Sequence, residues 1–131
     1  MGSSPIAAHR LVVDSRHHVT VSIYGTLKAM RESTRGKTKG RDHYGLFFGP
    51  PLTIGPRGAI AEREVGQIYL VANRFGAGVF AHELQHFLQH WIEINGWDPV
   101  GSEWETVAHL AGDMTARFWI WFYDSFEKRS P

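Results

Sequence analysis

The sequence predicts an α+β fold, with a β-sheet in the first part of the chain and two long helices in the second. Short runs rich in β-branched and aromatic residues, such as 19–24 and 66–72, occur before residue 75, and such runs favour strands. Two longer segments with helical periodicity follow. The chain has 131 residues, a length that suits one domain. We therefore expect a single domain over residues 1–131, with residues 1–8 as a loose terminus.

The expected elements follow in order along the chain. Strands are predicted at 11–13, 19–24, 44–48, 59–64 and 66–72, and a short helix capped by Thr26 is predicted over 26–33. Glycine and proline favour loops at 49–51 and 55–58. A helix over 79–95 should end at Gly96, because glycine readily adopts the left-handed conformation that closes a helix. A second long helix, capped by Ser102, should run to about residue 126.

Composition limits the chemistry that the protein can use. The chain has no cysteine and eight histidines, which excludes disulfides and thiolate metal sites. Any metal site must therefore consist of histidine and carboxylate side chains. No apolar run approaches the roughly 18 residues of a membrane span, and the first residues lack a signal-peptide pattern. We therefore expect a cytoplasmic protein with no membrane partner; the sequence does not indicate its oligomeric state.

Charge is unevenly distributed along the chain. Residues 1–74 carry a surplus of +6 and residues 75–131 a surplus of −5. A basic stretch lies between Lys28 and Arg41, and its cations are Lys28, Arg31, Arg35, Lys37, Lys39 and Arg41. Such a stretch could bind an acidic or nucleic-acid partner. It lacks interleaved aromatic residues for base stacking, and a solvated surface loop is the competing interpretation.

Residues 82–86 read His-Glu-Leu-Gln-His, an HExxH motif within the predicted helix 79–95. On a helix, His82 and His86 lie about 40° apart around the axis, so both imidazoles can reach one ion, and zinc accepts imidazole nitrogens. Glu83 lies about 100° from His82, within reach of a water on that ion, where it can act as general base. The apolar side chains form a separate face, which consists of Phe80, Leu84, Phe87, Leu88 and Trp91.

A zinc site needs a third protein ligand, and Glu105 follows His86 after eighteen residues. This HExxH-x18-E spacing resembles that of the gluzincin metallopeptidases, in which a glutamate from a second helix completes the site. The resemblance implies a small zincin-like domain with an N-terminal twisted β-sheet, an active-site helix and a long C-terminal glutamate helix. It also implies that the edge strand over the cleft is the one predicted at 67–72, to which an extended peptide would pair.

The predicted second helix carries small residues on the same side as Glu105, namely Ala108, Gly112, Thr115 and Ala116. Small side chains let two helices approach closely, which favours Glu105 as a ligand. Two alternatives stay open. Glu103 follows His86 at a shorter spacing, and Ser102 with Glu105 also forms a capping-box pattern.

Other polar residues are candidates for supporting roles. His109, one turn after Glu105, could orient a zinc ligand or donate to an oxyanion, or it could be an exposed helix histidine. Asp113 and Tyr69 are weaker candidates, and Tyr123 is too far along the helix. The run from His82 to His90 also resembles the HELxHxLxH pattern of ImmA/IrrE-type peptidases, although no helix-turn-helix segment follows.

The sequence therefore predicts a zinc metallopeptidase acting on a peptide or protein. His82, His86 and Glu105 are the expected ligands of Zn²⁺, Glu83 is the expected general base, and His109 is a second catalytic candidate. The first alternative is a catalytically silent zinc-binding or protein-interaction domain on a peptidase-like fold. The second is a structural domain in which HExxH occurs by chance.

Overall fold

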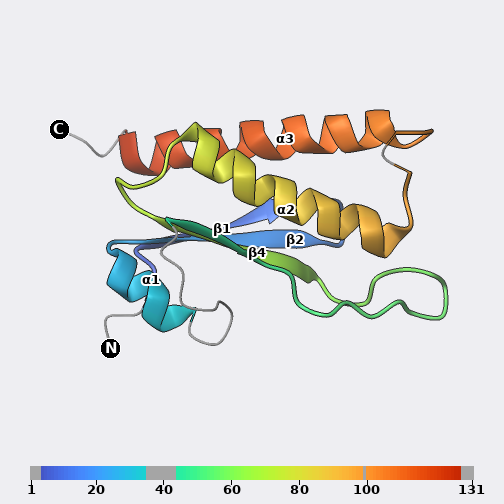
Figure 1. Cartoon of the computed structure of the whole chain (residues 1–131), viewed down its shortest axis with the longest axis horizontal. Coiled ribbons are helices and arrows are strands. Elements are labelled where there is room, and N and C mark those ends of the chain that lie inside the picture. The colour runs from blue at the N-terminus through green and yellow to red at the C-terminus, as the bar shows by residue number, and fades with distance from the viewer. Residues whose placement is uncertain (1–3, 35–43, 99, 128–131) are drawn as a thin grey trace.

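The computed structural model describes residues 4–34, 44–98 and 100–127. In chain order the elements are strands β1 (Ala7–Val12) and β2 (His18–Tyr24), helix α1 (Leu27–Ser33), and strands β3 (Gly45–Phe48) and β4 (Glu64–Val71). Helices α2 (Ala77–Asn95) and α3 (Trp104–Phe122) follow, and α3 continues into a π-helical turn, η1 (Tyr123–Glu127). The predicted α+β class, with a sheet before two long helices, is confirmed (Figure 1).

The four strands form one sheet in the order β1-β2-β4-β3. β1 and β2 are an antiparallel hairpin, β2 pairs parallel to β4, and β3 pairs antiparallel to β4. β4 is buried on both faces and lies inside the sheet. The prediction that residues 67–72 form an edge strand is therefore wrong. Among the described strands, the two edges are β1 and β3.

The helices cover the two faces of the sheet unequally. α2 and α3 pack side by side on one face, and α1 lies on the other (Figure 1). The main core lies under α2 and α3, where the rings of Phe80 and Phe118 stack with their centres 3.9 Å apart. A smaller core under α1 joins Met30 to Tyr24 and Tyr69. No helix in the described ranges is long and apolar enough to cross a membrane.

Two predicted helix boundaries are confirmed. The Thr26 hydroxyl accepts a hydrogen bond from the Ala29 backbone N–H at 3.1 Å, as expected of a cap. Gly96 ends α2 with a φ of 66°, in the left-handed region that glycine adopts without strain.

Other local predictions are wrong. No strand forms over 59–64, where Ile60 makes only an isolated bridge to Ile54. Residues 7 and 8 belong to β1 rather than to a loose terminus, since they lie in register with Ile23 and Ser22 of β2. α3 begins at Trp104 and no side chain caps it, so Ser102 is not the predicted cap, and the alternative capping box with Glu105 does not form either. The Ser102 hydroxyl donates instead to the Glu103 carboxylate.

A buried histidine closes the β1–β2 hairpin. The Nδ1 atom of His17 lies 2.8 and 2.9 Å from the two carboxylate oxygens of Asp14, and its Nε2 atom lies 3.0 Å from the carbonyl oxygen of Ile60. The imidazole therefore ties the hairpin turn to the loop before β4. Partial burial raises the pKa of Asp14, but hydrogen bonds from the His17 ring and the Arg16 backbone outweigh it, so the pKa lies below the ordinary value of 3.8.

The pKa shift of Asp14 predicts how stability changes in acid. Because the unfolded chain binds this proton more tightly, the contribution of Asp14 is present above about pH 4 and is lost as the pH falls through its folded-state pKa. Urea unfolding between pH 2.5 and 7 should therefore show a shallower acid loss of stability for Asp14→Asn than for the wild type. Asp14→Asn should also cost about 1 kcal/mol or less at pH 7, since this carboxylate is half exposed. Glu32→Gln, on the exposed side of α1, is the control, and an Asp14→Asn curve parallel to that of the wild type would contradict the role of Asp14.

Candidate functional site

The HExxH motif lies on the outer side of the N-terminal half of α2. The apolar face of the helix is buried in the core, and His82 and His86 are exposed on another side, so the predicted separation of the two faces is confirmed. The two histidine rings are 4.7 Å apart and nearly perpendicular, and their Nε2 atoms lie 3.1 Å from each other. One helical turn therefore directs both nitrogens at the same point.

The carboxylate of Glu83 lies beside this pair but is withdrawn from solvent. Its side chain has a relative exposure of 7%, while its two histidine neighbours are open to water. Glu83 and the two histidines line an open cavity of about 200 Å³, and the opposite wall is the edge strand β3, through Gly45, Leu46 and Phe47. The motif thus faces a sheet edge across a small cavity.

Two glycines allow β3 to approach α2 this closely. A Cβ atom at Gly45 would lie 2.6 Å from Cγ1 of Val79 and 3.3 Å from Oε2 of Glu83. A Cβ atom at Gly66, on β4, would lie 2.8 Å from the ring of Phe47. The ring of Phe47 therefore lies over Gly66, where it also packs against Phe87 of α2. Both glycines are needed for the wall of the cavity to form.

His82 and His86 fit part of a zinc site. With zinc–nitrogen bonds of about 2.0–2.1 Å, two ligands in a tetrahedral site are separated by about 3.3 Å. The observed 3.1 Å between the two Nε2 atoms is close to this separation. However, no group of three or more histidine, aspartate or glutamate side chains positioned to hold a metal ion occurs within the described ranges. The structure therefore brings together two of the three predicted ligands.

The structure does not bring Glu105 to the two histidines, contrary to expectation. α2 and α3 run antiparallel (Figure 1), and the stacking of Phe80 on Phe118 fixes their alignment. Glu105 lies thirteen residues from Phe118, about 20 Å along α3. His86 lies only six residues from Phe80, about 9 Å along α2. Glu105 is therefore level with the far end of α2.

Glu105 also points away from α2. Met114 and Phe118 mark the buried side of α3, and Glu105 lies about 160° around the helix from the middle of that side. Its carboxylate is 55% exposed and lies 3.4 Å from the Nε2 atom of His109. The expected contact between α2 and the small-residue stripe is wrong, because Ala108, Gly112 and Ala116 are exposed.

The bulky side chains of α3 explain this orientation. Burying Met114 and Phe118 turns the small residues outward, because they lie on the opposite side of the same helix. His109 contacts Glu105 and is exposed on the same side of α3, so it does not reach the cavity either. Asp113 is also exposed and pairs with Arg117 at 3.1 Å.

The remaining candidates lie elsewhere. Tyr69 is on the α1 side of the sheet, where its hydroxyl donates to Gln67, so it cannot face the cavity. Glu103 precedes α3 and accepts from Ser102, and Tyr123 lies in the turn after α3. Of the basic stretch, Lys28 and Arg31 are exposed on α1, and residues 35–41 lie outside the described residues.

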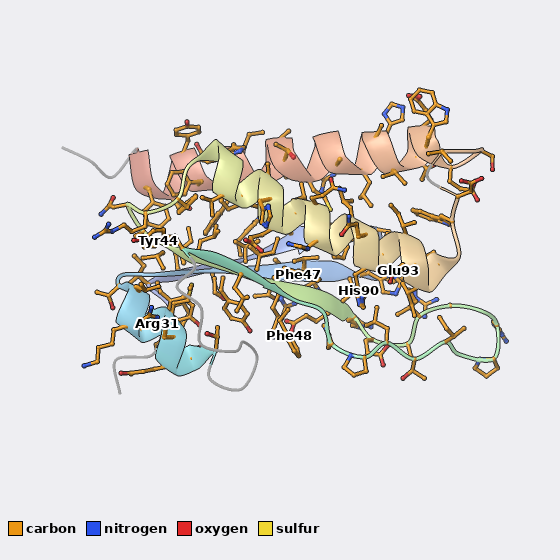
Figure 2. All side chains as sticks on the ribbon, viewed as in Figure 1. Arg31, Tyr44, Phe47, Phe48, His90 and Glu93 are labelled. Carbon is orange, nitrogen blue, oxygen red and sulfur yellow. The ribbon has the colours of Figure 1, made fainter. Side chains whose placement is uncertain are left out.

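His90 has a structural setting that its sequence position did not predict. Its ring lies beside Phe47, with the centres 6.0 Å apart (Figure 2). Its Nε2 atom is buried, and none of the described residues offers it a hydrogen-bond partner. His90 therefore packs behind the cavity wall and does not join His82 and His86.

Sequence reasoning missed Gly45 and Phe47 as wall residues. The strand 44–48 was predicted, but strand propensity does not tell which strand ends up at the edge. Comparison of the chain with family models, with curated proteins and with solved structures finds no match. The geometry of α2 and β3 therefore carries the functional argument alone.

The geometry predicts which residues bind zinc. His82→Ala and His86→Ala should each weaken zinc binding by more than about 100-fold, since even residues that support a ligand can cost 10–100-fold. Zinc competition with a chromogenic chelator measures this affinity. Glu105→Ala, an exposed carboxylate distant from the pair, should leave the affinity within about twofold. A loss in Glu105→Ala as large as in His82→Ala would show that Glu105 is a ligand after all.

The close approach of β3 to α2 makes a second prediction. Gly45→Val should lower the free energy of unfolding by about 1–3 kcal/mol, because its side chain would overlap Val79 and press on Glu83. Urea denaturation measures the change. Gly25→Val is the control, since a Cβ atom there meets only Ile6, at 3.6 Å. Equal stabilities of Gly45→Val and the wild type would contradict the packing described.

Proposed function

We propose that this protein is a small zinc-dependent peptidase whose site consists of His82, His86 and Glu83 on α2. The observation that carries the proposal is the position of one buried carboxylate beside two converging imidazoles, all facing the cavity under β3. His82 and His86 would hold the ion through their Nε2 atoms. When bound, zinc polarises a carbonyl group and makes water a stronger acid.

Glu83 is suited to move the proton in this reaction. A carboxylate that takes the proton from the attacking water can then deliver it to the leaving amine, which makes it a general base and then a general acid. The burial of Glu83 favours this role, because a group shielded from bulk water keeps a defined orientation toward the cavity. Glu83 follows His82 directly and precedes His86 by three residues, so it lies within one helical turn of both imidazoles.

The free edge of β3 is suited to hold an extended substrate. The carbonyl of Tyr44 accepts from the Val71 N–H at 3.2 Å, so Tyr44 faces β4. The alternate residues, Gly45 and Phe47, therefore turn their backbone groups away from β4. No described strand pairs with this edge. A peptide that adds to β3 would pass directly over the histidine pair, with main-chain hydrogen bonds supplying affinity for many sequences.

A second function is favoured by the incomplete ligand set. The described residues supply two converging nitrogens rather than three ligands, and the cavity is small and open. A zinc-binding or protein-interaction domain without turnover would use the same histidines and the same strand edge. The two functions differ in whether Glu83 has a chemical role.

The substitution Glu83→Gln distinguishes these functions. It should keep zinc affinity within about threefold but lower peptide hydrolysis by about 100-fold or more, the usual contribution of a general base. Mass spectrometry of a zinc-loaded peptide-library digest measures hydrolysis, and chelator competition measures zinc. Glu93→Gln, an exposed glutamate later on α2, is the matched control and should cleave at the wild-type rate.

Each outcome has a defined meaning. Hydrolysis by Glu83→Gln at the wild-type rate would remove Glu83 from the mechanism. Zinc binding by the wild type without cleavage of any library member would identify a binding domain.

A further inference from the structure

The opposite edge of the sheet, β1, has the features of a second peptide-binding edge. It lies on the far side of the sheet from β3, separated from it by β2 and β4. No described strand pairs with its outer side. Unlike β3, it lies next to α3 rather than α2. An occupant of β1 would therefore not contact His82 or His86, and this inference does not depend on the zinc site.

The register of the hairpin shows which backbone groups are free. The Val13 N–H donates to the His17 carbonyl at 2.9 Å, so these two residues face each other. In an antiparallel pair the residues alternate, so Ala7, His9 and Leu11 turn toward β2. The backbone groups of Ala8, Arg10 and Val12 then point away from the sheet. The outward backbone groups of these three alternate residues are enough to pair with an extended segment.

An apolar groove borders this edge. A cavity of about 340 Å³ lies between β1 and α3, lined by residues that include Leu11, Val12, Ile120, Trp121 and the basic Arg10 and Arg117. Ile120 is 63% exposed and Val12 40% exposed. The ring of Trp121 stacks on that of His9 with centres 4.8 Å apart, which fixes one wall. Free backbone beside exposed apolar side chains is the combination that β-strand addition uses.

The charges at the groove are positive. Arg10 and Arg117 line it. Asp113 offsets Arg117 through the contact at 3.1 Å, and on the Arg10 side the Glu64 carboxylate accepts from Thr20, the residue opposite Arg10 in β2. His9 adds no charge near neutral pH, because burial lowers its pKa below the ordinary value of 6.5. Arg10 stands on the middle of the three outward-turned positions, and its side chain is exposed. The charge of the edge therefore centres on one residue.

The central position of Arg10 argues against a second copy of the chain as the occupant of β1. Two β1 strands paired about a two-fold axis at their centre would set Arg10 directly opposite the partner's Arg10. Like charges directly opposite each other destabilise strand pairing. A carboxylate at that position would instead pair with Arg10. On an added strand the neighbouring side chains point to the other face, toward Ile120 and Trp121.

We propose that β1 is the docking site for an extended segment of another protein, with an acidic side chain opposite Arg10 and an apolar side chain on each side of it. The backbone of Ala8, Arg10 and Val12 provides the pairing, and the α3 groove receives the apolar side chains. Arg10 selects the charge of the partner.

Synthetic peptides test this proposal. The probes are the acetylated and amidated peptide Thr-Val-Glu-Val-Thr and its counterpart with lysine in place of glutamate, titrated into the full chain and followed by backbone amide NMR shifts. The wild type should bind the glutamate peptide at least about fivefold more tightly, because an opposite charge across the pair helps and a like charge hurts. The largest shifts should fall on Ala8, Arg10 and Val12.

Variants separate this site from nonspecific attraction. Arg10→Glu should reverse the preference, so that the lysine peptide binds more tightly. Val12→Pro should abolish binding of both peptides without unfolding the sheet, because the N–H that it removes points to solvent. Arg57→Glu makes the same charge change on a remote loop and should leave the preference unaltered.

Three results would overturn the proposal. One is equal affinity of the wild type for both peptides, and another is shifts centred on Gly45 and Phe47, which would place the peptide on β3. The third is a wild-type dimer in sedimentation equilibrium that Val12→Pro converts to a monomer, since a second copy would then be the occupant.

Discussion

Burial of the apolar face of α2 is the constraint on which the rest of the structure depends. Phe80, Leu84, Phe87, Leu88 and Trp91 all pack into the core between the sheet and α3. Burying a large apolar side chain contributes about 1.5–3 kcal/mol, so no other rotation of the helix competes with this one. The same rotation turns His82 and His86 outward and holds Glu83 against β3. The chemistry of the candidate site is therefore positioned by side chains that do not belong to it.

The same core determines what α3 can contribute. Phe118 stacks on Phe80 near the start of α2, and the short connection after Gly96 makes α3 run back along its neighbour (Figure 1). These two facts set the N-terminus of α3 beside the far end of α2. Glu105 lies there, on the solvent side, paired with His109. A helix whose bulky residues face the core cannot also direct its small residues and its first glutamate toward the same neighbour.

The parallel pairing of β2 with β4 gives the sheet two edges of different character. It places β4 inside the sheet and leaves β3 beside α2 and β1 beside α3. At β3, Gly45 brings a strand edge next to a carboxylate and two imidazoles. At β1, the edge meets exposed apolar side chains and carries an exposed arginine, Arg10, on the middle of its three outward-turned positions. One small sheet thus presents a candidate reaction site and a candidate docking site that do not overlap.

The sequence by itself determined the local features of this protein. Helical periodicity predicted α2 and the separation of its faces, Thr26 and Gly96 predicted helix ends, and HExxH predicted two converging imidazoles with a glutamate beside them. Each of these depends on residues within one or two turns, where 3.6 residues per turn fixes geometry. Tertiary structure alone decided the rest: which strand lies at the edge, that Gly45 and Phe47 form the cavity wall, and that Glu105 faces solvent. These outcomes depend on how distant segments share one core, and spacing along the chain does not encode that packing.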